Sequence, residues 1–129
     1  TLITGGTVED EVFQPTILSN VASDAKVSCQ EVFAPVVIVN PIQSIEQGIH
    51  EINNSDFGLQ AGIFTNDIKT ALHVSKKVQV GGVLINDIPT FRVDQMPYGG
   101  VKESGNGKEG LKYAIEEMTL MKLVIWNQS

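Results

Sequence analysis

Three glycines near the end of the chain have a spacing that is used in nucleotide binding. SGNGKEG (residues 104–110) places Gly105, Gly107 and Gly110 in the G-x-G-x-x-G pattern of a loop that cradles a dinucleotide pyrophosphate. That use requires a buried strand before the first glycine and a helix after the third. The preceding QMPYGGVKES does not read as a strand, whereas LKYAIEEM reads as a short helix. We therefore favour a glycine loop that leads into a helix over an independent nucleotide-binding domain.

Cys29 is the single thiol of the chain and the first candidate for a nucleophile. A reactive cysteine needs a helix N-terminus or a neighbouring cation. Lys26 is close in sequence but Glu31 opposes it, so we expect a buried, unreactive thiol. His50 and His73 fall within helical patterns, where we expect surface or half-buried positions. Two distant histidines and one cysteine show no metal-ligand spacing, so no metal site is predicted.

Two segments could bind organic ligands. In QEVFAP, Glu31 and Phe33 share one side of an extended backbone, where a carboxylate could bind a ribose and a ring could contact a planar group. A phenylalanine before a strand is otherwise a core residue. In NDIPTFRVDQMPYGG (residues 86–100), a long loop follows a strand, a common place for a site. Arg92 could bind an anionic group there or simply pair with Asp94.

Composition limits the classes of partner. Fifteen acidic and nine basic residues give a formal charge of −6, which disfavours nucleic acid. No apolar stretch is long enough to span a membrane and no signal peptide is visible. A single cysteine suits the reducing cytoplasm. The chain starts without Met, which suggests a fragment or a trimmed product.

Strand and helix patterns alternate through the chain. PVVIVNP, LQAGIFT and VGGVLIN are apolar runs typical of strands buried on both faces. SIEQGIHEIN, with Ser44 as N-cap, and DIKTALHVSKKVQ, with lysines near its end, are predicted helices. The order predicts an α/β fold with a mostly parallel three-layer sheet and flanking helices. TLMKLVIWN (residues 119–127) is a final strand that either joins its own sheet or pairs across an oligomer interface.

Several of these segments, in this order, resemble one family. CQEVFAPVVIV, INNSDFGLQAGIFTNDIKTALHVSKKVQVGGVLIND and MPYGGVKESGNGKEG are similar to the C-terminal part of the aldehyde dehydrogenase superfamily. The similarity covers nearly the whole chain from about Gly5. It implies a partial catalytic domain over residues 1–116 and an oligomerisation strand over residues 117–129.

The resemblance implies the chemistry of the parent enzyme. The family oxidises aldehydes to carboxylic acids with NAD or NADP. A cysteine thiolate forms a thiohemiacetal, hydride passes to the nicotinamide, and a glutamate-activated water hydrolyses the thioester. By position, Glu31 matches the ligand of the nicotinamide ribose and Phe33 the aromatic beside the nicotinamide. The stretch from Ile88 to Met96, with Phe91 and Arg92, and then Tyr98 match the wall of the aldehyde tunnel.

The chain also departs from the family pattern. The family's nucleophile and general base lie upstream of the E-x-F-[GA]-P motif, so Cys29 is not the nucleophile and no catalytic residue is expected here. The resemblance further implies that SGNGKEG does not bind dinucleotide and that the isolated chain is inactive. Lactaldehyde or glyceraldehyde-3-phosphate dehydrogenases are the nearest members suggested, with Arg92 holding a polar or anionic tail. NAD and NADP are not distinguished by these residues.

Assembly is expected through the last strand. Residues 117–127 match the arm that extends a partner's sheet, which predicts a homo-oligomer in the cytoplasm. Cut from the rest of the catalytic domain, the chain would expose apolar surface on PVVIV or GVLIN. A non-catalytic dimerisation module derived from the family is the alternative.

Overall fold

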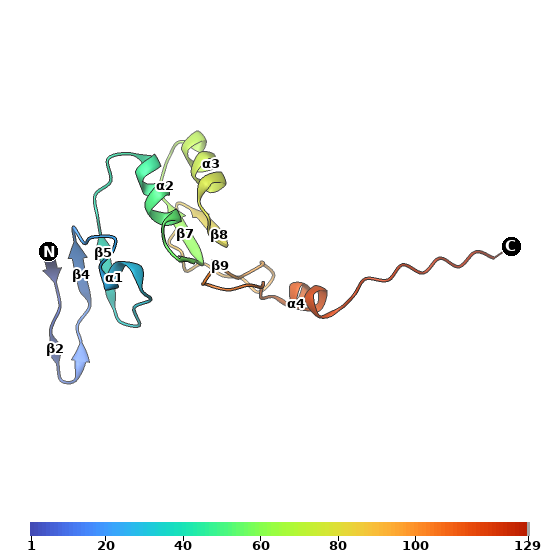
Figure 1. The fold of residues 1–129 in the computed structure, drawn as a ribbon, viewed down its shortest axis with the longest axis horizontal. Helices are drawn as coiled ribbons and strands as arrows, with labels where there is room; N and C mark the ends of the chain where they lie inside the picture. Colours follow the sequence, from blue (N-terminus) through green and yellow to red (C-terminus); the bar gives the residue numbers. More distant parts are fainter. Residues whose placement is uncertain (129) are drawn as a thin grey trace. The chain divides into compact units, whose positions relative to one another are not determined.

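The computed structural model describes residues 1–128 of the chain (Figure 1). These residues divide into two compact units, of which the first spans Thr1–Asp56 and the second begins at Phe57. The Glu31 and Phe33 segment belongs to the first unit, and the loop with Arg92 and Tyr98 belongs to the second.

The first unit contains β1 (Leu2–Thr4), β2 (Val8–Glu9), β3 (Val12–Phe13), β4 (Thr16–Ser19), α1 (Lys26–Cys29), β5 (Val36–Val39) and α2 (Ile45–Asn53). Its main sheet has the order β1-β4-β5 (Figure 1). β1 is antiparallel to β4, and β4 is parallel to β5 with Thr16 opposite Val36. β2 and β3 form an antiparallel hairpin. The buried hydroxyl of Thr16 accepts a hydrogen bond from Gly6 N (2.8 Å) and donates one to Gln14 O (2.8 Å), which ties the hairpin to the sheet.

α2 begins as the sequence predicts. The Ser44 hydroxyl accepts a hydrogen bond from Gln47 N at 3.2 Å, and the Gln47 side chain accepts one from Gln43 N at 2.8 Å. The first contact satisfies a backbone donor that the first helical turn leaves unpaired, and the second pairs the backbone N–H of the residue before the N-cap. Ile49 is the buried residue of this helix, as the apolar spacing predicts.

The second unit contains β6 (Phe57–Gly58), β7 (Gln60–Ile63), α3 (Ile68–Lys77), β8 (Gly82–Ile85), β9 (Val101–Lys102) and α4 (Leu111–Met118). β7 and β8 are parallel and are connected through α3, with Gln60 opposite Gly82. β6 pairs with β9 in an antiparallel ribbon. The α/β class and the parallel pairing are confirmed, although within residues 1–128 the two parallel pairs lie in separate sheets.

α3 confirms a second predicted helix. The Asp67 carboxylate accepts hydrogen bonds from Lys69 N at 3.2 Å and from Thr70 N at 2.9 Å. Ala71 and Val74 are buried, and lysines occupy the last turn, where they favour the negative end of the helix dipole. The predicted range and charge polarity of this helix are confirmed, but its predicted inner face is wrong in part: Ile68 and Leu72 are 68% and 52% exposed, and only Val78 of the three predicted inner residues is buried.

The central strands are less buried than their apolar sequence predicts. Val37 and Val39 of β5 are 58% and 53% exposed, and Ile85 of β8 is also exposed. The prediction that these runs are buried on both faces is thus wrong for this chain. The physical reason is that a strand is covered only by the layers next to it, and one face of β5 meets no layer within the first unit. The companion expectation, that the chain exposes apolar surface on PVVIV, is confirmed.

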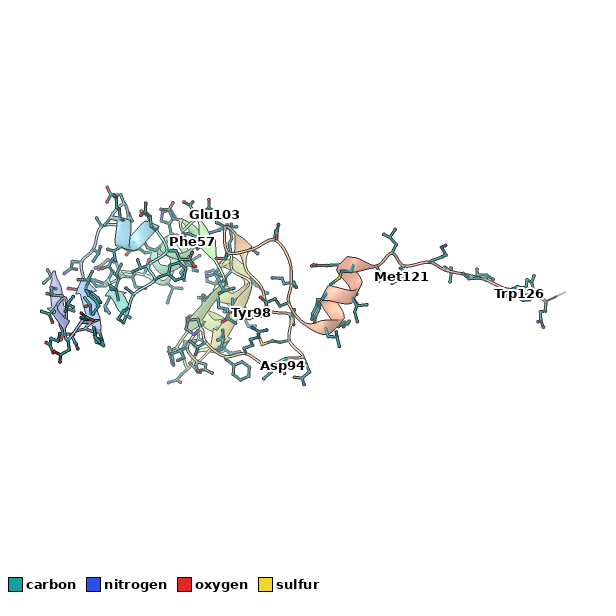
Figure 2. The ribbon with its side chains drawn as sticks, turned by 90° about the horizontal axis from the view of Figure 1, so that it is seen from below. Phe57, Asp94, Tyr98, Glu103, Met121 and Trp126 are labelled. Atoms are coloured by element: carbon teal, nitrogen blue, oxygen red, sulfur yellow. The ribbon has the colours of Figure 1, made fainter. Side chains whose placement is uncertain are left out.

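The segment after α4 does not form a strand within the described residues. Residues 119–128 are extended but make no sheet pairing, and Met121 and Trp126 project from this segment (Figure 2). Trp126 is 82% exposed and Leu120 is 97% exposed. Insertion into the chain's own sheet is thereby contradicted, because no strand edge of the second unit receives this segment. The predicted boundary between residues 116 and 117 falls inside α4, and the division into domains stays a prediction.

Within residues 1–128, no helix is long and apolar enough to cross a membrane.

Candidate functional site

The loop from residue 86 to residue 100 leaves the carboxyl end of β8 at a fixed point. Asn86 N donates to Ile63 O at 2.7 Å, and the Asn86 side-chain oxygen accepts from Thr65 N at 2.7 Å. Asn86 has a φ of 58°, a left-handed conformation that asparagine tolerates better than most residues. These contacts tie the loop to the carboxyl ends of both parallel strands, the edge at which α/β sheets bind ligands.

Arg92 lies between a carboxylate and an aromatic ring. Its Nη2 donates to Glu109 Oε2 at 3.0 Å, and its guanidinium carbon lies 4.5 Å from the centre of the Tyr98 ring. The Arg92 and Glu109 side chains are 49% and 63% exposed, so the charges remain accessible to solvent. Within residues 1–128, Arg92 does not pair with Asp94, and its counter-ion Glu109 lies 17 residues later in the chain.

Tyr98 and Glu109 are held against each other by their backbones. Tyr98 N donates to Glu109 O at 3.3 Å and Glu109 N donates to Tyr98 O at 2.5 Å, which forms an isolated antiparallel bridge. Tyr98 is half-buried. The ring and the carboxylate that contact Arg92 therefore come from one rigid pair of backbone positions.

Phe91 is next to this group in sequence. Its side chain is exposed, and its carbonyl oxygen accepts a hydrogen bond from Gln60 Nε2 at 3.4 Å. The structure thus brings Arg92 and Tyr98 into contact and anchors the backbone of Phe91 to β7. Sequence reasoning misses Glu109, because the glycine pattern of SGNGKEG gives this residue no role of its own.

The SGNGKEG segment forms a loop that leads into a helix. β9 ends at Lys102 and pairs antiparallel with β6, so no buried parallel strand enters Gly105. α4 begins directly after Gly110, whose φ of 114° suits glycine. A side chain at Gly99 would collide with the carbonyl oxygen of Gly107, so glycine here permits close packing of two loops. The geometry of a dinucleotide fingerprint is absent from this part of the described chain.

Glu31 and Phe33 lie in the first unit, in the irregular segment between α1 and β5. Both side chains are exposed, and Phe33 is 92% exposed. The reading of Phe33 as a core residue of this chain is therefore wrong. A carboxylate and an uncovered ring, two residues apart, remain available to contact a ligand.

Cys29 is exposed at the end of α1, so the prediction of a buried thiol is wrong. α1 is one turn long, and its C-terminal residue is not covered by another element of the first unit. The sulfur makes a long contact with Asp24 O at 3.6 Å. His50 and His73 are exposed helix residues, as expected. Among residues 1–128, no group of three or more His, Cys, Asp or Glu side chains could hold a metal ion.

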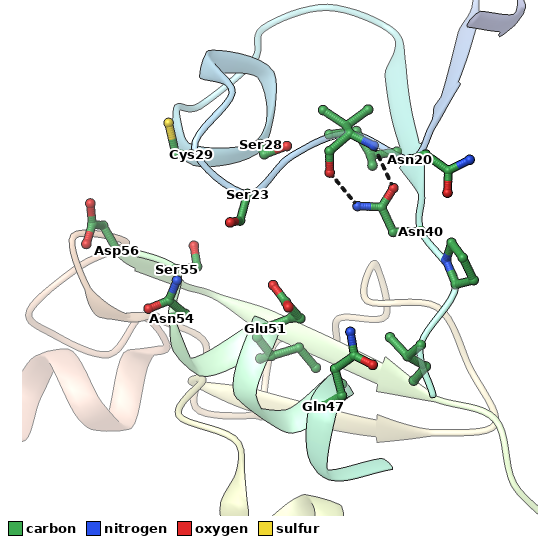
Figure 3. Close-up of a pocket in the computed structure, with 16 residues that line it drawn as sticks. Asn20, Ser23, Ser28, Cys29, Asn40, Gln47, Glu51, Asn54, Ser55 and Asp56 are labelled. Atoms are coloured by element: carbon green, nitrogen blue, oxygen red, sulfur yellow. Dashed lines mark hydrogen bonds between the residues drawn. The ribbon is translucent and has the colours of Figure 1, made fainter. Parts of the chain in front are cut away.

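A pocket of about 630 Å³ lies in the first unit (Figure 3). Asn40 shapes one wall, where its side chain donates to Val21 O at 2.8 Å and accepts from Val21 N at 3.0 Å. The buried hydroxyl of Ser28 has no hydrogen-bond partner within residues 1–128. The polar lining side chains point to no single class of ligand; they are Asn20, Ser23, Ser28, Asn40, Gln47, Glu51, Asn54, Ser55 and Asp56.

Comparison with known proteins identifies the family. Residues 1–124 match the model of the aldehyde dehydrogenase family. The chain is 51% identical over 123 residues to a 3-sulfolactaldehyde dehydrogenase of Priestia aryabhattai, covering 95% of this chain and 26% of that protein. It is 45% identical over 126 residues to a lactaldehyde dehydrogenase of Methanococcus aeolicus, covering 98% and 27%.

A solved structure agrees with these relatives. The structure of a glyceraldehyde-3-phosphate dehydrogenase from Methanocaldococcus jannaschii complexed with NADP matches with a TM-score of 0.83 and 45% identity. The match covers 91% of this chain and 25% of that one. The chain therefore belongs to the aldehyde dehydrogenase family, and it spans about a quarter of the length of the curated relatives it matches.

Proposed function

We propose that the protein containing this chain oxidises a short aldehyde with an anionic tail to a carboxylic acid, with NAD or NADP as oxidant. The observation that carries the substrate class is the position of Arg92, stacked on Tyr98 and paired with Glu109 through Nη2. A guanidinium has five N–H donors in a fixed fork. The contact with Glu109 uses one of them, which leaves donors for a forked contact with a sulfonate, phosphate or carboxylate.

The names of the relatives support this substrate class. One acts on 3-sulfolactaldehyde and one on glyceraldehyde 3-phosphate, and each of these names denotes a short aldehyde with an anionic group. In the proposal Arg92 binds the anionic tail, while Phe91 and Tyr98 supply the wall along which the aldehyde lies. A neutral hydroxyaldehyde such as lactaldehyde would use the same wall without the charge contact.

The proposed cofactor contacts come from the first unit. The exposed carboxylate of Glu31 can accept hydrogen bonds from a ribose, and the uncovered ring of Phe33 can pack against a planar ring. The residues present therefore fit the nicotinamide ribose end of NAD or NADP. A bound nicotinamide would supply the acceptor for hydride.

The proposal gives this chain no nucleophile and no general base. Cys29 lies beside Glu31 in sequence, and the family's nucleophile is expected in another segment. The 129-residue chain alone is thus expected to lack turnover. Its remaining contribution would be the apolar segment after α4, as an arm that pairs with a second subunit in a cytoplasmic homo-oligomer.

The substrate class is tested with matched aldehydes in the whole protein. We would compare kcat/KM for glyceraldehyde 3-phosphate and for glyceraldehyde in the wild type, in Arg92→Gln and in the control Lys69→Gln. The phosphate preference is the ratio of kcat/KM for glyceraldehyde 3-phosphate to kcat/KM for glyceraldehyde. Loss of a charged contact in Arg92→Gln should lower this ratio by about 10- to 100-fold. An unchanged phosphate preference would refute the role of Arg92 in binding the anionic tail. Absence of any aldehyde oxidation by the wild type would refute the proposed activity.

A further inference from the structure

Glu109 is the residue that links Arg92 to the turn before α4. Its carboxylate oxygen Oε2 lies 3.0 Å from Arg92 Nη2, and no other acidic side chain in residues 1–128 forms an ion pair with this arginine. The two side chains are 17 positions apart, so the contact depends on the fold of the second unit. Sequence reasoning gives this glutamate no role.

The backbone of Glu109 is restrained on each side. Its N–H and C=O pair with Tyr98, and the preceding Lys108 donates from Nζ to Gly99 O at 2.8 Å. α4 starts two residues later at Leu111. A carboxylate on such a fixed position can select one orientation of a long, flexible arginine side chain.

The pair contributes little to stability. Both partners are largely exposed, and ion pairs of this kind are weak because solvent screens them and because two side chains lose rotamer freedom. Its stronger effect is on orientation, because the Tyr98 ring limits one face of the guanidinium while Glu109 fixes one of its edges. Together they restrict the directions in which the remaining N–H donors point.

We propose that Glu109 is a positioning residue that orients Arg92 for the anionic tail of the substrate. The inference rests on the proposed function, since Arg92 must bind that tail. Glu109 acts through Arg92 and does not touch the substrate. The orientation comes from a hydrogen bond as well as from charge, so an acceptor without charge retains part of the effect.

Two substitutions separate orientation from charge. Glu109→Ala removes the acceptor, whereas Glu109→Gln keeps a carbonyl oxygen at the same position and removes the charge. In the whole protein, we expect Glu109→Ala to raise KM for glyceraldehyde 3-phosphate by about tenfold, with a much smaller change in kcat. Glu109→Gln should raise the same KM only about two- to threefold. Glu103→Gln, an exposed carboxylate in the same glycine-rich region, is the charge-matched control.

The same assay distinguishes the outcomes. A lower KM for the phosphate substrate in both Glu109 variants would mean that Glu109 competes with the substrate for Arg92, which overturns the proposal. An equal rise of KM for glyceraldehyde and for its phosphate would mean a general structural role, which also overturns it. If Arg92→Gln abolishes the phosphate preference while Glu109→Ala leaves it intact, only the positioning role fails. If Arg92→Gln has no effect on the phosphate preference, the proposal that Arg92 binds the anionic tail is refuted.

Discussion

Arg92 illustrates what single residues reveal when only the sequence is known. Its type and its place in a long loop after a strand predict either an anion-binding role or a pair with Asp94. Its partner could not be predicted, because Asp94 is the nearer acidic residue in sequence, whereas Glu109 is brought to it only when the two loops pack. Close packing of Gly99 against Gly107 is one cause of that approach. The sequence therefore indicates the candidate residue but not the contacts that orient it.

Glu31 provides a test of the cofactor contact at the residue scale. If its exposed carboxylate binds the nicotinamide ribose, Glu31→Gln should raise KM for NAD or NADP by about two- to threefold, because the amide keeps an acceptor oxygen but loses the charge that strengthens the hydrogen bond. The measurement is the initial rate of NADH or NADPH formation at varied cofactor and saturating aldehyde.

Glu9→Gln serves as the matched control, since Glu9 is an exposed acid in the β2–β3 hairpin of the same unit. Equal KM values in the two variants would refute the assignment of Glu31.

At the scale of elements, helices and strands differ in how far the sequence determines them. α2 and α3 begin at Ser44 and Asp67 because those side chains cap their own backbone, which is a local interaction. The apolar spacing also predicts Ile49 of α2 as an inner residue, whereas in α3 it favours Ile68 and Leu72, which are exposed, over the buried Ala71 and Val74. The burial of β5 could not be predicted, because it depends on layers that the sequence of the strand does not specify.

The cap of α3 makes a prediction about pH. Hydrogen bonds from the Thr70 hydroxyl, Thr70 N and Lys69 N lower the pKa of Asp67 below its ordinary value. A carboxylate whose pKa is lower in the folded than in the unfolded state stabilises the fold at pH values above its unfolded pKa. This stabilisation disappears as the pH falls through the folded-state pKa. Asp67→Ala should thus reduce the urea midpoint of unfolding at pH 7. The difference in urea midpoint between the variant and the wild type should become smaller below about pH 4.

Far-UV circular dichroism at pH 7 and near pH 3 would measure both midpoints. Asn66→Ala, one residue earlier and exposed, should leave them unchanged. If the urea midpoints of Asp67→Ala and wild type differ by the same amount at both pH values, the charge of Asp67 does not contribute to stability.

For the whole molecule, the apolar residues after α4 form an uncovered segment. Leu120, Leu123 and Trp126 are each more than four-fifths exposed. An extended apolar segment without pairing favours addition to a sheet edge of a second chain. The double substitution Leu123→Asp and Trp126→Asp places two charges in this segment. It should reduce the molecular mass of the assembly in solution to about half or less, since twofold dimers are the commonest assembly.

Sedimentation equilibrium of the wild type, the double variant and the control Lys122→Gln would measure this mass. A wild type that is already monomeric at micromolar concentration would contradict assembly through this segment.

The bridge between Tyr98 and Glu109 has a consequence for how the family can change its substrates. Arg92, Tyr98 and Glu109 lie within 17 positions of one another and close a short loop on themselves. Short loops have a small entropic cost of closure, so the arrangement forms from nearby sequence. One exchange of the contiguous residues 92–109 would therefore transfer the Arg92 guanidinium, the Tyr98 ring and the Glu109 carboxylate together. Under the proposed role of Arg92, recombination would move a preference for anionic aldehydes between relatives in one step, without assembling it one residue at a time.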